Sequence, residues 1–192
     1  MTDETGRAPR RRADARRNES ALLDAAAAVF VASGVEAPVR DIAAKAGVGV
    51  GTVYRHFPTR ADLVVAVYRH QVEACAVAGE EALERADSPF EALRRWIDVF
   101  VDFLVTKHGL AGALQSDDPQ FQVLHAYFLD RLLPVGTRLL EAGVAAGEVR
   151  DDVTAIELMR GVGGLCIGPA DDRYDVRHTV GVFLDGMRAP AR

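Results

Sequence analysis

Residues 38–63 read P-V-R-D-I-A-A-K-A-G-V-G-V-G-T-V-Y-R-H-F-P-T-R-A-D-L. The first half carries apolar residues at i, i+1 and i+4 from Ile42, the spacing of a buried helical face. Gly47 follows, at a position where helices commonly end on a residue in the left-handed conformation. The second half has its own apolar pair four residues apart, Val53 and Phe57. The stretch therefore predicts a helix-turn-helix, the motif whose second helix enters the DNA major groove.

Three consecutive segments of this stretch match one known pattern: R-D-I-A-x-x-A-G-V over 40–48, G-T-V-Y-R-H-F over 51–57 and P-T-R-x-D-L over 58–63. They resemble the DNA-binding domain of the TetR family (TetR/AcrR type) of transcriptional regulators. The resemblance covers the first third of the chain, and the remainder is compatible with the family's variable helical C-terminal domain. It implies an all-α fold, in which a three-helix helix-turn-helix DNA-binding domain over 14–60 precedes a helical ligand-binding and dimerisation domain over 61–192.

The composition is that of an ordinary globular chain, with 49% apolar and 27% charged residues among 192. The longest apolar run, Ala25–Ala32, is too short to span a bilayer, and no apolar secretory segment follows the arginines near the N-terminus. Cys75 and Cys166 lack metal-ligand spacing and fit reduced thiols. We therefore expect a cytoplasmic protein without membrane contact, cofactor or bound metal.

The charge is divided unevenly along the chain, whose net charge is −5. Residues 1–60 hold ten basic and seven acidic side chains, a net charge of +3, and the rest holds 13 basic and 21 acidic, a net charge of −8. A basic front orients a molecule toward a polyanion such as DNA. The acidic remainder is read as the part that keeps a helical domain soluble.

Residues 1–13 are polar, rich in arginine and without periodicity, which predicts a disordered arm. Arg16 and Arg17, with the arginines before them, either neutralise phosphates and follow a minor groove or form a solvated tail with weak attraction for DNA. No strand is expected, and Pro134 is expected to kink the helix that contains it. Helices are expected over 14–33, 38–46, 50–57, 60–85, from Pro89 onward, and over 109–115, 120–146, 153–167 and 172–188.

The resemblance places the DNA contacts in and around the second helix of the motif. Many family members begin this helix with Ser and a polar residue, whereas this chain has Gly49-Val50-Gly51. Direct base readout is therefore expected from few groups: Thr52, Arg55, the backbone of Gly51, and Val50 against a thymine methyl. The expected phosphate contacts are Arg40, Tyr54, His56, Thr59 and Arg60. For His56, structural packing is the alternative.

The helix from Pro89 and the helix over 120–146 carry aromatic and apolar residues with occasional polar groups. Such a set suits a pocket for a small apolar or amphipathic effector, and it suits a plain core equally well. The family resemblance favours the pocket. Its expected lining is Trp96, Phe100, Phe103, His108, Leu124, His125, Phe128 and Leu129.

Gly161, Gly163 and Gly164 fall inside a predicted helix, where each costs roughly 1 kcal/mol relative to Ala. The cost is tolerated where backbones approach closely, and a local helix break is the alternative. The resemblance implies a homodimer joined by the last two helices of each subunit, with Met159, Val162, Gly163, Val180, Phe183, Leu184 and Met187 at the interface. Two recognition helices about 34–36 Å apart would read a palindromic operator in double-stranded DNA.

The sequence contains no nucleophile elbow, P-loop or dinucleotide fingerprint, so an enzyme is not expected. We predict a ligand-responsive transcriptional repressor of the TetR type. Two alternatives stay open: a transcriptional activator on the same fold, and a helical small-molecule binding protein with a vestigial DNA-binding domain. The affinity of a regulator for DNA falls steeply as salt rises, which separates it from the second alternative.

Overall fold

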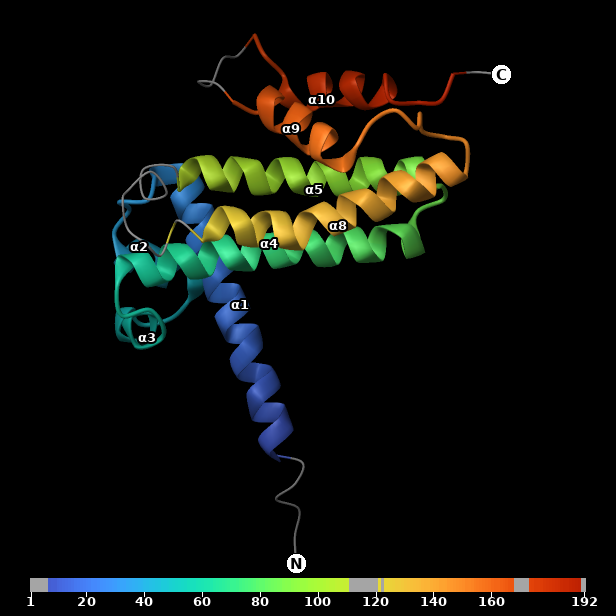
Figure 1. Ribbon diagram of the computed structural model, residues 1–192. Helices are drawn as coiled ribbons and strands as arrows, with labels where there is room; N and C mark the ends of the chain where they lie inside the picture. The colour runs from blue at the N-terminus through green and yellow to red at the C-terminus, as the bar shows by residue number, and fades with distance from the viewer. Residues whose placement is uncertain (1–6, 111–120, 122, 168–172, 191–192) are drawn as a thin grey trace, which may run out of the picture. The chain divides into compact units, whose positions relative to one another are not determined.

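The computed structural model describes residues 7–110, 121, 123–167 and 173–190, with side chains from Arg17 onward. Helices dominate these residues, which contain no strand and one isolated β-bridge, between Val149 and Arg188. The helices are α1 (Arg7–Ser33), α2 (Val39–Ala46), α3 (Val50–His56), α4 (Arg60–Arg85), α5 (Pro89–Gly109), α8 (Leu124–Ala145), α9 (Ala155–Leu165) and α10 (Val176–Asp185) (Figure 1). The expected all-α fold is confirmed.

The chain divides into two compact units. The first comprises Met1–His70 and His108–Phe121, and the second comprises Gln71–Lys107 and Gln122–Arg192. The division falls within the continuous helix α4. The end of the DNA-binding domain at residue 60 stays a prediction. In the described part of the chain, no helix is both long enough and apolar enough to cross a membrane.

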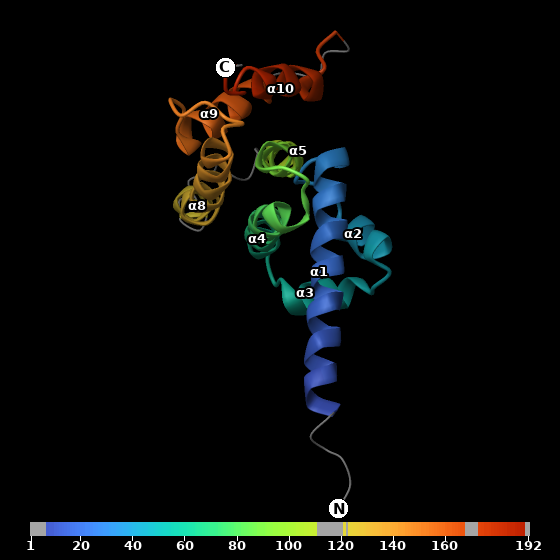
Figure 2. The ribbon, with the colours of Figure 1, turned by 90° about the vertical axis from the view of Figure 1, so that its right-hand side faces the viewer.

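The first unit is built on α1, which begins earlier than expected. Residues 7–13 belong to this helix and not to the predicted arm, consistent with the high helix propensity of Ala and Arg. Residues 1–6 lie outside the described part. Figure 2 shows α2 lying beside α1. Leu22, Ala26 and Phe30 of α1 are fully or almost fully buried, and they support the helix-turn-helix from behind.

The turn between α2 and α3 has the predicted geometry. Gly47 ends α2 with φ 68° and ψ 28°, in the left-handed region that favours glycine. Its N–H donates to the carbonyl of Ala44 at 3.2 Å, and the N–H of Val48 donates to that of Ala43 at 3.0 Å. Buried Ile42 then holds α2 against the core, so the local pattern alone accounts for this element.

The second unit packs around Trp96 of α5, which is fully buried and donates from Nε1 to the carbonyl of Cys75 on α4 at 3.1 Å. Burial raises the pKa of the Cys75 thiol to about 12, so this thiol is inert. Pro134 lies inside α8, as expected. The helix predicted over 109–115 falls mostly outside the described residues.

The last two helices are shorter than predicted, and both begin with a side-chain cap. The hydroxyl of Thr154 accepts from the N–H of Glu157, and the Glu157 carboxylate accepts from the N–H of Thr154 at 2.8 Å. Asp175 accepts from the N–H of His178 at 3.0 Å at the start of α10. These reciprocal bonds satisfy N–H groups that a helix end otherwise leaves without partners.

Candidate nucleic-acid interface and effector region

Helix α3 divides its side chains between the core and solvent. Val53 is 1% exposed and anchors the helix. Around the rest of the helix, Val50 is 40% and Tyr54 51% exposed, and Arg55 and His56 are exposed as well. Two large side chains with apolar surface, one cation and one imidazole thus face solvent from a single short helix. This is the arrangement that a recognition helix needs.

The start of α3 is bare backbone. Gly49 is the N-cap, with φ −75° and ψ 147°, and no side chain caps the helix. Its carbonyl accepts from the N–H of half-buried Thr52 at 2.8 Å. In the described part of the chain, no neighbouring atom lies within 4 Å of the position that a Cβ on Gly51 would take. The backbone can therefore approach a base edge or a phosphate closely here.

Three predicted DNA contacts, Arg16, Arg17 and Arg40, precede α3 in the chain, and the structure describes the side chains of two of them. Arg40 is exposed, and its Nε lies 3.5 Å from the carboxylate of Asp41, its neighbour in the chain. Arg17 is exposed on α1. The side chain of Arg16 lies outside the described part. Arg40 is free enough to exchange its weak surface pair for a phosphate.

Thr59 has a role that the sequence analysis did not identify, because it caps α4. Its hydroxyl donates to the carboxylate of Asp62 at 2.7 Å and accepts from the N–H of Asp62 at 3.0 Å. The N–H of Thr59 donates to the same carboxylate at 3.0 Å. The T-x-x-D pattern at 59–62 could have identified this capping box.

Arg60 also bonds within the chain. Its Nη2 donates to the carbonyl of Ala37 at 2.6 Å, and its guanidinium carbon lies 5.8 Å from the ring centroid of Phe30. The side chain is half-buried. The predicted phosphate contacts therefore separate into an exposed set, Arg40 on α2 with Tyr54 and His56 on α3, and a pair, Thr59 and Arg60, that is engaged at the start of α4.

The predicted effector lining contains a stack of aromatic rings in the second unit. Trp96 lies 5.7 Å from Phe100, and Phe103 lies 5.5 Å from Phe128, centroid to centroid. Phe100 joins the two pairs, at 6.2 Å from Phe103 and 6.1 Å from Phe128. These four residues, which we call the aromatic cluster, are buried, as is Leu124. Leu129 is half-buried.

Polar groups border the aromatic cluster on the Phe128 side. The exposed imidazole of His125 stacks on Phe128 at 6.0 Å, and the ammonium of Lys107 lies 5.7 Å from the same ring centroid. Burial lowers the pKa of Lys107. Within the described residues Lys107 has no carboxylate partner. His108, which was predicted to line the pocket, is exposed.

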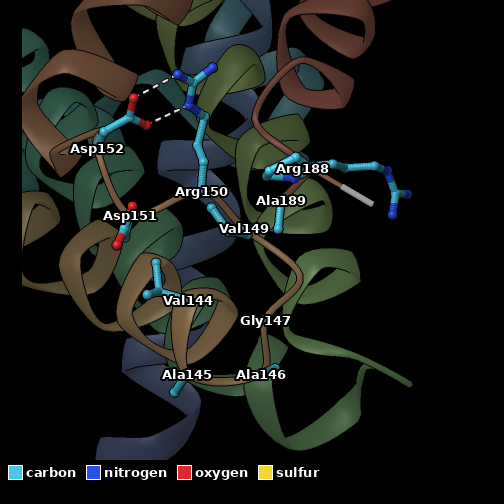
Figure 3. A pocket seen from close by; sticks show the side chains of 11 residues that line it. Val144, Ala145, Ala146, Gly147, Val149, Arg150, Asp151, Asp152, Arg188 and Ala189 are labelled. Atoms are coloured by element: carbon cyan, nitrogen blue, oxygen red, sulfur yellow. Dashed lines mark hydrogen bonds and ion pairs between the residues drawn. The ribbon is translucent and has the colours of Figure 1, made fainter. Parts of the chain in front are cut away.

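Two open clefts lie elsewhere in the second unit, and the aromatic cluster lines neither. The larger, about 1090 Å³, is bordered by the end of α8 and the segments 149–152 and 188–190. Figure 3 shows Arg150 and Asp152 pointing toward each other at its edge, while Arg188 extends away from them. The smaller cleft, about 480 Å³, is lined by residues of α9, α10 and the segment before α9.

Most residues predicted for the dimer interface are buried within the chain itself. These are Met159, Val162, Val180, Leu184 and Met187, whereas Gly163 and Phe183 are half-buried. A Cβ on Gly161 would lie 2.7 Å from Cζ of Phe183, so this glycine serves the contact between α9 and α10 of one chain. Among the described residues of these helices, Ile156 and Val182 are the large apolar side chains classed as exposed, at 38% and 60%. Helical spacing marked the apolar positions but could not tell which of them face solvent.

Comparison with known proteins identifies the chain. Residues 22–67 match the family of bacterial regulatory proteins of the tetR type, and residues 88–189 match the C-terminal domain of SbtR-like transcriptional regulators. The HTH-type transcriptional repressor KstR2 of Mycolicibacterium smegmatis is 30% identical over 145 residues, which are 72% of this chain and 69% of that protein.

Solved structures agree over almost the whole chain. A TetR transcriptional regulator from Streptomyces coelicolor, SCO0520, superposes with a TM-score of 0.80 and 32% identity, over 90% of this chain and 99% of that one. A TetR transcription regulatory protein from Mycobacterium vanbaalenii superposes with a TM-score of 0.74 and 34% identity, over 93% of this chain and 99% of that one. This chain therefore belongs to the TetR family of bacterial transcriptional regulators, helix-turn-helix proteins that bind DNA operators and act as dimers.

Proposed function

We propose that this protein is a homodimeric transcriptional repressor that reads a palindromic operator with α3 and releases it when an effector binds the second unit. The observation that carries the proposal is the exposed face of α3, where Val50, Tyr54, Arg55 and His56 point to solvent. The relatives named as repressors support this direction of control. The protein would act in the cytoplasm and would carry out no catalysis.

On the operator, Arg55 and Thr52 would contact base edges, and Val50 would contact a thymine methyl. The backbone of Gly49 and Gly51 would approach the groove. Tyr54, His56 and Arg40, with Arg16 and Arg17 of α1, would contact phosphates and set the register. Few base-reading side chains imply that a large part of the affinity comes from phosphates, so binding should weaken steeply with salt.

For the effector we propose a small amphipathic molecule with an anionic end. Its apolar part would bind against the aromatic cluster, and its anionic group would pair with Lys107, whose half-buried ammonium has no carboxylate partner in the described residues. Such a molecule shifts the equilibrium away from the DNA-binding state only as far as its affinities for the two states differ.

The DNA-binding part is tested by fluorescence anisotropy on duplexes selected by the protein from a random-sequence library. Affinity for a selected duplex should exceed affinity for its scrambled version and fall with rising salt, and Tyr54→Ala should abolish it. Equal affinity for both duplexes would leave the helical small-molecule binding protein as the better account. Activation instead of repression would appear as increased transcription from a reporter that carries the operator.

The effector part is tested with Trp96, the single tryptophan of the chain, as a fluorescent probe. Dodecanoate should change the Trp96 emission at lower concentration than dodecanol does. Lys107→Met should remove that difference and leave the response to dodecanol unchanged. If the two compounds act alike on the wild type, Lys107 does not recognise the effector.

A further inference from the structure

One side chain joins the two ends of the helix-turn-helix. The chain enters the motif at Ala37, directly before the N-cap of α2, and leaves it through Phe57 to α4, which begins at Arg60. Nη2 of Arg60 donates to the carbonyl of Ala37 at 2.6 Å, across 23 residues of sequence. Entry and exit are therefore tied together by one hydrogen bond from a charged donor, which is stronger than a neutral one.

The same guanidinium lies against α1. Its central carbon is 5.8 Å from the ring centroid of Phe30, which is fully buried. Nη1 of Arg60 is shut away from solvent and has no hydrogen-bond partner among the described residues. A buried donor without a partner costs stability, so packing and the bond to Ala37 must offset that cost.

This environment does not suit a phosphate contact. A guanidinium that binds phosphate needs its nitrogens in solvent, whereas one terminal nitrogen of Arg60 is occupied and the other is enclosed. The Asp62 carboxylate also lies at the start of α4, where it accepts both the N–H and the hydroxyl of Thr59. Its negative charge opposes the approach of a phosphate to this helix end.

We propose that Arg60 is a positioning residue, which sets the orientation of α3 by closing the helix-turn-helix onto α1 and acts on DNA only through α3. The inference rests on the proposed reading of DNA by α3. Lysine cannot replace Arg60 in this role, because the single nitrogen of an ammonium cannot both lie over the Phe30 ring and donate to the carbonyl of Ala37. Charge alone is thus not sufficient at this position.

The test measures affinity for a duplex selected by the wild type and for its scrambled version, over a range of salt concentrations. Arg60→Lys and Arg60→Met should each lower the ratio of the two affinities about tenfold or more. The salt dependence of binding to the scrambled duplex should stay that of the wild type. Arg85→Met removes an exposed charge from the other end of α4 and should leave the ratio unchanged.

A phosphate contact would behave differently. Arg60→Lys would then resemble the wild type, while Arg60→Met would weaken both duplexes alike and reduce the salt slope by about 0.9. Either that pattern or an unchanged ratio in both variants would overturn the inference. If the wild type selects no duplex at all, the proposed function fails and the inference fails with it.

Circular dichroism shows whether each variant is folded at the assay temperature. Should Arg60→Met not fold, the milder pair Arg60→Lys and Phe30→Leu decides the question. Each should lower the affinity ratio. The ratio of the double variant should be no lower than that of the more damaging single variant, because Phe30 acts on α3 through Arg60. If the free-energy losses of the two single variants add in the double variant, Phe30 does not act through Arg60.

Discussion

The two carboxylate oxygens of Glu73 on α4 each accept a hydrogen bond from the guanidinium of Arg131 on α8, one from Nε and one from Nη2, both at 2.7 Å. The hydroxyl of Tyr127 donates to the same carboxylate. The hydrogen bonds from Arg131 lower the pKa of Glu73. This network joins α4 to α8 within the second unit.

Glu73→Gln should lower the free energy of unfolding at pH 7 by about 1 kcal/mol or less, because both partners are about 40% exposed and solvent screens the pair. The folded-state pKa of Glu73 lies below its unfolded value of about 4.3, so the stabilisation is full above that value and is lost as pH falls through the folded pKa. Urea unfolding should therefore separate wild type and variant at neutral pH and bring them together in acid. A difference of the same size at both pH values would contradict the role of ionised Glu73.

Gly79→Ala should destabilise the second unit by about 1–3 kcal/mol, although Ala favours a helix. A Cβ there would lie 2.2 Å from Cγ1 of Val135 and 2.7 Å from Cδ1 of Trp96. Thermal unfolding measures the loss, and the emission of Trp96 should shift as its packing loosens. Gly164→Ala is the matched control, since no neighbouring atom of the described residues lies within 4 Å of its Cβ position. An unaltered melting temperature in Gly79→Ala would show that the side chains of Val135 and Trp96 can move away from the added methyl group without loss of stability.

Gly163→Ala tests the proposed dimer interface. Among the described residues of one chain, no neighbouring atom lies within 4 Å of its Cβ position, so the protomer should tolerate the methyl group and gain helix stability. If the glycine permits close approach of a second copy, dimerisation should weaken by about 1–3 kcal/mol. Sedimentation velocity over a dilution series gives the dissociation constant. The interface assignment fails if Gly163→Ala and Gly164→Ala dimerise equally well.

Arg55→Ala and Tyr54→Phe should separate base readout from phosphate contact. Loss of Arg55 should cost about 1–3 kcal/mol on a selected duplex and less on its scrambled version, because a guanidinium discriminates between bases. Loss of the Tyr54 hydroxyl should weaken both duplexes alike, by about 0.5–1.5 kcal/mol. Anisotropy on the two duplexes measures both effects. Equal losses for Arg55→Ala would remove it from the base-reading set.

The local patterns in the sequence predicted the helix-turn-helix and the start of α4 well. The bounds of α4, the left-handed turn at Gly47 and the short recognition helix from Val50 are all confirmed. Each depends on residues within one or two helical turns, where capping and apolar spacing decide the conformation. Helix α1 is longer than the sequence predicts, because the arginine-rich residues 7–13 form its first turns and arginine favours a helix.

The roles of individual side chains depended on distant partners. Arg60 fits a phosphate contact by its position in the motif, yet its guanidinium lies between Ala37 and Phe30, which are 23 and 30 positions earlier in the chain. Gly161 fits an interface between two copies, yet it accommodates Phe183 of its own chain.

The sequence by itself thus determined the presence of the described helices, the turn between α2 and α3 and the family, because these follow from short-range spacing and from residues matched in register. Only the tertiary structure decided which polar groups remain available to a ligand and which are already bonded inside the chain. The reason is that a hydrogen bond or a steric contact depends on distance in space, and helical periodicity specifies direction around one helix only.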